Sequence, residues 1–535
     1  MDRIGHLNHS EFDLIVIGGG SVGAGIARDA AMRGLTTLLV EKGDFGCGTS
    51  SRTSKIVHGG IRYLEQGEIR LVIESLRERF ILQKIAPHLV HPLPFLIPVF
   101  KDGPRPLWMI RAGLWIYDAL SMFRNKQRFQ LINREEILRL LPGLEPDRIL
   151  GGGIYYDSQM NDARLVLENV LDAKSSGATV LNYVQVEKFR TDGKKLTGVV
   201  LNDKIEGGRI EVGGRAIVNA GGPWVSQIAA DAGDKNPIQI RTTQGTHIIV
   251  PSLSREYAIV VTPKEQKRIF FIIPWYGNSL IGTTDLDYEG DPSAVHPLPG
   301  EIDYLLGETR KLFPRTGPKK EDIIAIFSGL RPLLNDRCSD PSAASRRSKI
   351  AESASGLISI AGGKFTTYRS IAEKAVDLVG RRLARTDLKE CRTSVDPLYG
   401  GKLKKSFDRF LEEDGKKWAG QYQIDLSIIS HLIGQYGSRT KEVLNLVEKD
   451  RSLGERISPA FLNIKAEIVY SIEIEMALTL SDFLRRRTLL GLSGLNSQDV
   501  LLQICSAMGK VLSWNQDRVS RELENYRKDI YVQFM

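Results

Sequence analysis

Residues 12–23, with the sequence FDLIVIGGGSVG, decide the fold of this chain. Their first half is a short apolar run typical of a buried strand. The glycines that follow, Gly18, Gly20 and Gly23, have the spacing G-x-G-x-x-G. In that motif the first glycine permits a tight turn, the second lets the backbone approach a pyrophosphate, and the third lets a helix pack closely on the strand. Because the start of the next helix offers free N–H groups to an anion, the stretch predicts a dinucleotide site.

The residues after the glycine turn complete the same unit. Residues 24–33 are predicted to form a helix of small side chains that ends at Gly34, and residues 36–40 a second strand that ends in Glu41. Glu41 lies 23 residues after Gly18, where a carboxylate can accept hydrogen bonds from a ribose diol. An ordinary packing turn would not need this spacing, so the context favours a nucleotide site. The motif alone does not choose between FAD and NAD.

Two more strand ends favour FAD. Residues 218–222, VNAGG, and residues 362–364, GGK, each place small residues at a strand end. Three such ends, far apart in the chain, fit a long cofactor lying across one sheet, although ordinary turns between strand and helix have a similar composition. The polar loop at residues 44–58 can reach along that cofactor. The predicted cofactor contacts are Gly18, Gly20, Gly23, Glu41, Thr49, Ser50, Ser51, Lys55, His58, Gly59, Val186, Ala220, Gly221, Gly363, Lys364 and Thr366.

Bulk composition narrows the possible partners. The net charge of +9 suits nucleic acid, an anionic membrane surface or an acidic substrate, and nucleic acid ranks last because no nucleic-acid-binding motif is present. The four cysteines, Cys47, Cys338, Cys391 and Cys505, contain no C-x-x-C pair, which argues against a zinc site or a disulfide framework. Residues 1–11 lack the apolar core of a signal peptide, and no apolar run approaches the ~20 residues of a membrane-spanning helix. The prediction is a cytoplasmic protein, peripherally attached to the inner face of the cell membrane.

The chain is long enough for two or three domains. The predicted fold class is α/β: a Rossmann-like FAD-binding domain of the glutathione-reductase type, a substrate domain with an antiparallel sheet, and a C-terminal helical domain. The FAD-binding domain is expected to be discontinuous, at residues 1–79, 155–245 and 325–385. The cap domain takes residues 80–154 and 246–324, and residues 386–405 form a linker to helices at 406–535. In that helical domain, the charged run Arg485-Arg486-Arg487 is predicted to lie on a solvent-exposed face.

Several further segments carry a resemblance. They are TSS at residues 49–51, SKIVHGGIRYLE at 54–65, GTTD at 282–285, SGLRPL at 328–333, GGKFTTYR at 362–369, YGSR at 436–439 and LRRRT at 484–488. With the glycine turn, they make the chain similar to the FAD-dependent glycerol-3-phosphate dehydrogenase family along nearly its whole length. The H-G-G-x-R-Y and G-G-K-x-T-T-Y segments are the most specific.

The resemblance implies an activity and a substrate site. The activity is oxidation of sn-glycerol 3-phosphate at C2 to dihydroxyacetone phosphate, with electrons passing to FAD and then to a membrane quinone. By matching position, the substrate site is lined by Arg62, Tyr63, Arg331 and Lys364, with Ser279 and Thr283 as weaker candidates. Near residue 345 the family usually has Arg-Asp, whereas this chain has Arg346-Arg347, so Arg346 is a candidate whose local pairing differs. The resemblance also implies a homodimer.

The chemistry of that substrate agrees with these residue types. A phosphomonoester carries nearly two negative charges, and the planar forks of Arg62, Arg331 and Arg346 bind such a group through paired hydrogen bonds, while Lys364 adds a point charge. Oxidation at C2 also needs a base for the hydroxyl proton. His58, beside Gly59-Gly60, is the first candidate and His247 the second. Arg331 or Lys364 could instead stabilise the alkoxide. The predicted catalytic set is therefore His58, Arg331 and Lys364, and no metal-ligand cluster is evident.

Residues 104–128 bear on the electron acceptor. Aromatic and basic residues are interleaved there, as in a helix that lies in the lipid headgroup plane, and a helix buried against the substrate domain would fit equally. A quinone acceptor requires membrane access, which favours peripheral attachment. Three other functions stay open: a glycerol-phosphate oxidase that uses oxygen, an amine or amino-acid oxidase of the same fold, and a non-catalytic flavoprotein.

Overall fold

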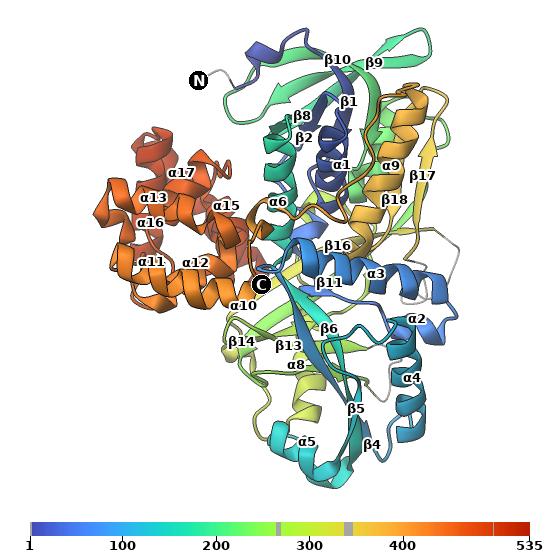
Figure 1. Cartoon of the computed structure of the whole chain (residues 1–535), viewed down its shortest axis with the longest axis vertical. Helices are drawn as coiled ribbons and strands as arrows, with labels where there is room; N and C mark the ends of the chain where they lie inside the picture. Colours follow the sequence, from blue (N-terminus) through green and yellow to red (C-terminus); the bar gives the residue numbers. More distant parts are fainter. Residues whose placement is uncertain (1–2, 264–268, 336–345, 496, 535) are drawn as a thin grey trace.

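The computed structural model describes residues 3–263, 269–335, 346–495 and 497–534. Figure 1 shows three regions: an α/β region around α1, a β-rich region below it, and a group of helices at one side, coloured orange to red. Cys338 lies outside the described residues. None of the helices in the described stretches is both long and apolar enough to cross a membrane.

The α/β region is built on a largely parallel sheet. Its strand order is β17-β18-β10-β1-β2-β7, and all neighbours from β18 to β7 run parallel, while β17 is antiparallel to β18. Ile17 pairs with Val40 on one side and with Asn219 on the other, so the carboxyl ends of three strands align. Ligands of such sheets bind at this edge. The bounds are β1 Glu11–Ile17, β2 Thr37–Val40, β7 Thr179–Leu181, β10 Arg209–Asn219, β17 Ser348–Glu352 and β18 Leu357–Gly362.

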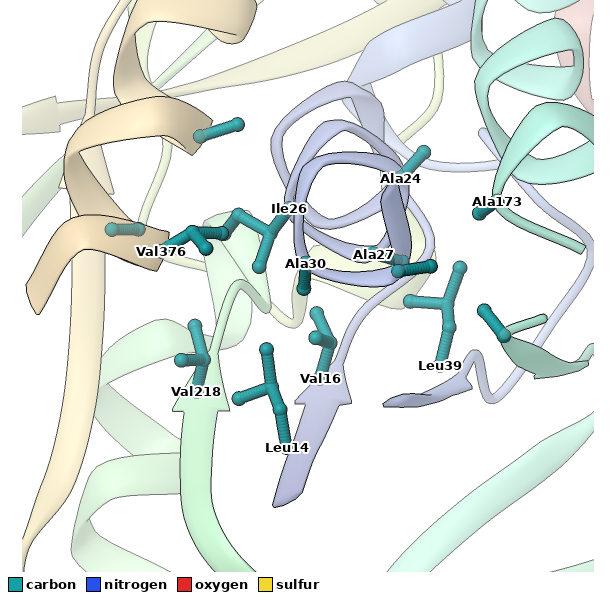
Figure 2. Packing of buried hydrophobic residues seen from close by; sticks show 14 of the residues in the cluster. Leu14, Val16, Ala24, Ile26, Ala27, Ala30, Leu39, Ala173, Val218 and Val376 are labelled. Carbon is teal, nitrogen blue, oxygen red and sulfur yellow. The ribbon is translucent and has the colours of Figure 1, made fainter. Parts of the chain in front are cut away.

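Helices α1 (Ser21–Met32), α6 (Asp162–Ser175) and α9 (Tyr368–Arg382) cover one face of this sheet. In Figure 2 the apolar side chains of the strands point at the alanines of α1. Small side chains let α1 lie close to the sheet. A Cβ at Gly23 would collide with the carbonyl oxygen of Gly18, so the predicted packing role of Gly23 is confirmed.

The other face carries the antiparallel strands β8 (Val184–Asp192) and β9 (Lys195–Asp203), and β9 pairs with β10. Strands β9 and β10 are thus antiparallel neighbours, and β10 continues past this pairing to Asn219. Gly213 is the point at which this strand changes partner, since it pairs with Gly198 of β9 and with Glu11 of β1.

The β-rich region is a second sheet with the order β15-β11-β14-β13-β12-β4-β6-β3, where β16 also pairs with β11 and β5 with β6. The predicted antiparallel pairing of β11, β13 and β14 is confirmed. Strands β3, β6, β11 and β16 lie at least partly in segments predicted for the FAD-binding domain. Those segments therefore contribute strands to the second sheet as well. The bounds are β3 Ile56–Val57, β4 Val90–Phe100, β5 Gln130–Asn133, β6 Ile149–Met160, β11 Ile240–Pro251, β12 Ala258–Val261, β13 Phe270–Trp275, β14 Asn278–Gly282, β15 Leu286–Asp287 and β16 Ala325–Leu334.

Four helices pack around the second sheet: α2 (Arg62–Glu65), α3 (Ile69–Ile85), α4 (Leu107–Leu120) and α8 (Pro299–Leu312).

The C-terminal region, predicted to be helical, is helical and has two apolar cores of its own. Arg28 of α1 and Arg33, which follows α1, donate hydrogen bonds to backbone carbonyls of the predicted linker. The longer C-terminal helices are α11 Gly415–Tyr422, α12 Leu426–Tyr436, α13 Thr440–Lys449, α14 Ala466–Glu473, α16 Gln498–Leu512 and α17 Gln516–Phe534.

Candidate active site

One cavity of about 490 Å³ joins the two sheets. Its nucleotide end is lined by the glycine turn and by the carboxyl ends of β1, β2 and β10, and its other end by residues of α2, β16 and the turn after β18. A long ligand can therefore span the edge of the parallel sheet and reach the second sheet.

The nucleotide end is mostly backbone. Gly18 has a φ of +106°, and a Cβ on it would lie 2.6 Å from the Ala220 carbonyl oxygen, so only glycine fits there. The N–H of Ser21, at the start of α1, donates to the Ser50 hydroxyl at 3.0 Å. The Glu41 carboxylate accepts hydrogen bonds from Gly19 N–H (2.7 Å) and Gly43 N–H (2.9 Å), and burial raises its pKa. Those two bonds leave lone pairs for a ribose.

Most of the predicted cofactor contacts line this cavity. They are Gly18, Gly20, Glu41, Thr49, Ser50, His58, Val186, Ala220, Gly221, Gly363, Lys364 and Thr366. Sequence reasoning missed Lys42 and Trp224, whose ammonium and indole ring lie 3.7 Å apart at the nucleotide end. The position of Lys42 directly after Glu41 was the available signal.

Four predicted contacts do not line the cavity. Gly23 packs against Gly18 instead. The Lys55 ammonium donates to the Ser51 carbonyl and to Asp162, both at 2.6 Å, so Lys55 and Ser51 face the inside of the loop. Gly59 is turned toward Leu76 and Tyr117, where a Cβ would collide with both side chains. The sequence of a polar loop does not show which side of the loop each residue faces.

The other end of the cavity gathers the predicted cations. Arg62, Arg331, Arg346 and Lys364 all line it, together with Tyr63. Arg331 is held by Asp285 (3.1 Å), by the Thr283 hydroxyl (2.8 Å) and by the Thr284 carbonyl (3.2 Å). The Lys364 ammonium donates to the His58 carbonyl (3.2 Å) and to the Ser75 hydroxyl (3.1 Å), and it lies 4.8 Å from the centre of the Tyr63 ring.

Crowding of these cations shifts several pKa values. Burial, with repulsion from Arg346 and Arg62, lowers the pKa of Arg331 to about 10 against the pull of Asp285. Burial also lowers the pKa of Lys364. For Tyr63, burial alone would raise the pKa, but Lys364, Arg346 and Arg62 lower it. The positive charge gathered at this end of the cavity is suited to a multiply charged anion.

Thr283 lines the cavity as predicted, whereas Ser279 does not. The Ser279 side chain is fully buried in β14, and its hydroxyl accepts the backbone N–H of Leu253 at 2.9 Å. The prediction for Ser279 is therefore corrected to a bond that holds the second sheet. Arg346 lines the cavity, and the Arg347 beside it pairs with Glu68 at 2.6 Å.

Both candidate histidines line the cavity. Burial lowers the pKa of His58 well below its ordinary value, and Lys364, Arg62 and Arg346 lower it further. His247 Nε2 lies 2.9 Å from the Ser54 hydroxyl, and its ring stacks on Phe327. Burial, followed by Arg331 and Lys55, lowers the pKa of His247 well below its ordinary value too. At neutral pH both rings are therefore neutral.

A buried carboxylate supports the loop that carries His58 and Arg62. Asp157 accepts hydrogen bonds from the Tyr117 hydroxyl (2.7 Å), from Arg79 (2.5 Å) and from the Gly59 N–H (3.2 Å). Burial raises the pKa of Asp157, while Arg79 opposes that shift. Sequence reasoning missed this residue, and no local motif marks it, because its partners lie on α3, α4 and the loop after β3.

Comparison with known proteins identifies the family. Residues 13–369 match the FAD dependent oxidoreductase family, and residues 391–519 match the C-terminal domain of alpha-glycerophosphate oxidase. A glycerol-3-phosphate dehydrogenase of Synechocystis sp. is 36% identical over 99% of this chain and 98% of its own length. An aerobic glycerol-3-phosphate dehydrogenase of Staphylococcus epidermidis is 35% identical over 98% and 95%. The chain belongs to the FAD-dependent glycerol-3-phosphate dehydrogenase family.

Solved structures agree with this family. The glycerol-3-phosphate dehydrogenase of Bacillus halodurans, complexed with FAD, has a TM-score of 0.82 and 32% identity, and the match covers 99% of this chain and 97% of that one. An L-alpha-glycerophosphate oxidase of Mycoplasma pneumoniae shares the fold at a TM-score of 0.55 and 18% identity, over 69% of this chain and 95% of that one. The predicted fold class and FAD as cofactor are confirmed.

The cavity of this family member fits FAD. A Cβ at Gly20 would stand 3.1 Å from the Ser50 hydroxyl, in the space between the start of α1 and the following loop where a pyrophosphate would pass. Glu41 would hold the ribose, and Ala220, Gly221 and Gly363 leave room beneath a long cofactor. When bound, FAD supplies a two-electron acceptor.

Proposed function

We propose that this protein oxidises sn-glycerol 3-phosphate at C2 to dihydroxyacetone phosphate, with a membrane quinone as the final electron acceptor. The observation that carries the proposal is that Arg62, Arg331, Arg346 and Lys364 share one cavity with the dinucleotide cradle. Three guanidinium groups and an ammonium suit a phosphate dianion better than the single carboxylate of an amino acid. The names of the relatives support the same substrate.

The residues at the cation end have separable roles in this proposal. Arg331 and Lys364 are already oriented by neighbouring groups, Arg331 by Asp285 and Thr283 and Lys364 by Ser75. They would bind the substrate without much loss of side-chain entropy. Arg62 and Arg346 complete the charge of the site, and the centre of the Tyr63 ring lies 5.8 Å from the Arg62 guanidinium carbon and 4.8 Å from the Lys364 ammonium. Arg331 or Lys364 would also stabilise negative charge on the C2 oxygen as its proton leaves.

We assign the base to His247, with His58 as the second candidate. A base gains a positive charge, so the charges around it decide how much protonation costs. His58 faces Lys364, Arg62 and Arg346, whereas His247 faces Arg331 and Lys55. Arg331 is paired with Asp285 and Lys55 with Asp162, which reduces the repulsion at His247. Replacing each ring by asparagine and comparing the rates of flavin reduction tests the choice: a larger loss in His58→Asn would reverse it.

The decisive experiment is the absorbance of the purified protein under anaerobic conditions. Addition of sn-glycerol 3-phosphate should bleach the flavin band, and a soluble quinone analogue should restore it. Glycerol and glycine serve as controls because each lacks the phosphate. A flavin band that this substrate leaves unchanged would reject the substrate, and bleaching by glycine would favour an amino-acid oxidase. Peroxide released in air despite an excess of quinone analogue would favour an oxidase.

The surface of α4 supports access to membrane quinone. On this helix Trp108 is 70% exposed and Trp115 57%, while Ile110, Leu114 and Tyr117 are buried. The helix therefore presents one apolar face to the second sheet and another to the outside. This helix and the segment that follows it also carry exposed basic side chains: Arg111, Arg124, Lys126 and Arg128. This combination favours an anionic lipid surface.

Vesicle flotation tests this part of the proposal. The wild type should float with vesicles that contain an anionic phospholipid at low salt, and Trp108→Ser/Trp115→Ser should remain in the dense fraction. Leu502→Ser is the matched control, because Leu502 is 46% exposed on α16, in the C-terminal helices. Equal flotation of both variants would remove α4 from the proposal. The predicted homodimer stays a prediction, which sedimentation equilibrium would test.

A further inference from the structure

One buried carboxylate of the cofactor-binding region, Asp44, contacts the C-terminal helices. Asp44 accepts two hydrogen bonds from the Arg487 guanidinium, with Nη1–Oδ2 and Nη2–Oδ1 distances of 2.7 Å each. Arg486 Nε donates to the same Oδ2 at 2.5 Å, and the Asn182 side chain donates to Oδ1 at 3.2 Å. Asp44 and Arg487 are each 1% exposed. The two arginines hold the pKa of Asp44 well below its usual range, so the pair is ionic.

Asp44 belongs to residues 41–50, which we call the cofactor loop. The inner side of this loop lines the cavity through Glu41, Lys42, Gly46, Cys47, Gly48, Thr49 and Ser50, and Asp44 does not line it. The loop is also tied to the glycine turn, since Gly46 N–H donates to the Gly19 carbonyl at 2.9 Å and Glu41 accepts the Gly19 N–H. Movement at Asp44 would therefore shift the groups that face the cofactor.

The two arginines come from the end of a short helix, Phe483–Arg487, that is anchored within the C-terminal helices. Arg487 also donates to the backbone carbonyl of Glu475, and Arg486 donates to Asp482. The predicted solvated face for Arg485-Arg486-Arg487 is thus wrong for Arg486 and Arg487. Their partner Asp44 is more than 440 positions away in the chain, and a local charge pattern cannot indicate it.

We propose that Arg487 and Arg486 are positioning residues for FAD: the C-terminal helices fasten the outer side of the cofactor loop, so that its inner side keeps the geometry that retains the cofactor. The hydrogen bonds between a carboxylate and two arginines are directional, so they fix the position of the loop. An apolar contact is not directional and would leave the loop free to shift. The proposal needs only FAD binding, so it stands or falls independently of the substrate and of the electron acceptor.

A neighbouring ion pair provides a matched control. Arg164 of α6 and Glu475 form a buried two-bond pair at 2.8 and 3.1 Å, also between the α/β region and the C-terminal helices. Arg164 is 1% and Glu475 0% exposed. Neither lines the cavity. Because Arg487 uses only the backbone carbonyl of Glu475, Glu475→Gln should leave the clamp on Asp44 in place.

The experiment follows flavin fluorescence after dilution of holoprotein, which reports release of FAD, and records thermal unfolding of the same samples. Asp44→Asn should release FAD about tenfold faster or more than the wild type, since charge-assisted bonds are lost. Arg487→Lys keeps the charge but removes the fork, and should show the same effect in milder form. Glu475→Gln should lower thermal stability to a similar degree with FAD release within about twofold of the wild type.

Two results would overturn the proposal. Release of FAD from Asp44→Asn at the rate of Glu475→Gln would make the clamp an ordinary stabilising contact. If Asp44→Asn does not fold, Arg487→Lys alone decides: wild-type retention of FAD in that variant would have the same meaning.

Discussion

The two ends of the cavity are built in different ways. At the nucleotide end, the continuous unit from β1 to Glu41 supplies the glycine turn, the start of α1 and the Glu41 carboxylate, and the groups of the turn are backbone groups. At the cation end, Arg62 lies far in the chain from Arg331, Arg346 and Lys364, and all four act through their side chains. The first end should therefore depend most on its glycines. The second should lose function with any one cation while the cofactor stays bound.

The largest effect is expected at Gly18. Valine there would meet the Ala220 carbonyl and would have to adopt a φ of +106°, so Gly18→Val should retain less than about a tenth of the wild-type flavin. Gly34→Ala is the control, because Gly34 also has a positive φ (+93°) but a Cβ on it meets no atom within 4 Å. That variant should cost about 1 kcal/mol of unfolding free energy and keep its flavin. The ratio of flavin to protein absorbance measures both, and equal flavin loss would mean that backbone strain alone decides retention.

Arg331 tests the other end. Arg331→Met should lower kcat/KM for sn-glycerol 3-phosphate by about 10²-fold or more, because charge-assisted bonds to the phosphate or the C2 oxygen are lost. Its flavin content should remain that of the wild type. Arg134→Met is a suitable control, since Arg134 forms an exposed ion pair with Asp147 on the surface. Loss of flavin together with activity in Arg331→Met would contradict the division of the cavity into two independent ends.

The two ends also differ in how much of each the sequence could predict. The turn, the helix and Glu41 are local, so the spacing of three glycines predicted them. Nothing local links Arg62 with Arg331, and these two were assigned together only through a family resemblance. Ser51, Lys55 and Gly59 are predicted as contacts because they belong to or follow the polar loop, and Ser279 is a weaker candidate by matching position to the family. Their orientation depends on Asp162, Tyr117 and Leu253, which no local pattern links to them.

A smaller effect is expected from pH, through His247. Burial lowers the pKa of His247 in the folded state, so the unfolded state binds more protons as the pH falls below about 6.5. The unfolding free energy of the wild type should therefore fall as the pH drops from 6.5 through the lower pKa of the folded state. His247→Asn should show a shallower fall over that window. Denaturant titrations at pH 7.5 and 5.5 measure the difference, and parallel curves for the two proteins would show that His247 does not titrate differently on folding.

The smallest effect should come from Tyr117, which links the outer helix α4 to the cation end. Its hydroxyl donates to Asp157, the carboxylate that also accepts the Gly59 N–H beside His58. In Tyr117→Phe the Asp157 carboxylate keeps Arg79 and Gly59, so unfolding free energy should fall by only about 1 kcal/mol. The loop that carries His58 and Arg62 would lose one support. KM for sn-glycerol 3-phosphate should therefore rise by about two- to fivefold, with FAD retained.

Tyr436→Phe is the matched control for Tyr117→Phe. Tyr436 is equally buried, on α12 of the C-terminal helices, and its hydroxyl donates to the Glu467 carboxylate at 3.1 Å. It should cost similar stability without changing KM. If both variants change KM alike, general loosening of the fold explains the effect. If only Tyr117→Phe raises KM, the position of α4 affects the cation end through Asp157. Binding of the exposed apolar face of α4 to a lipid surface would then also affect the position of Gly59.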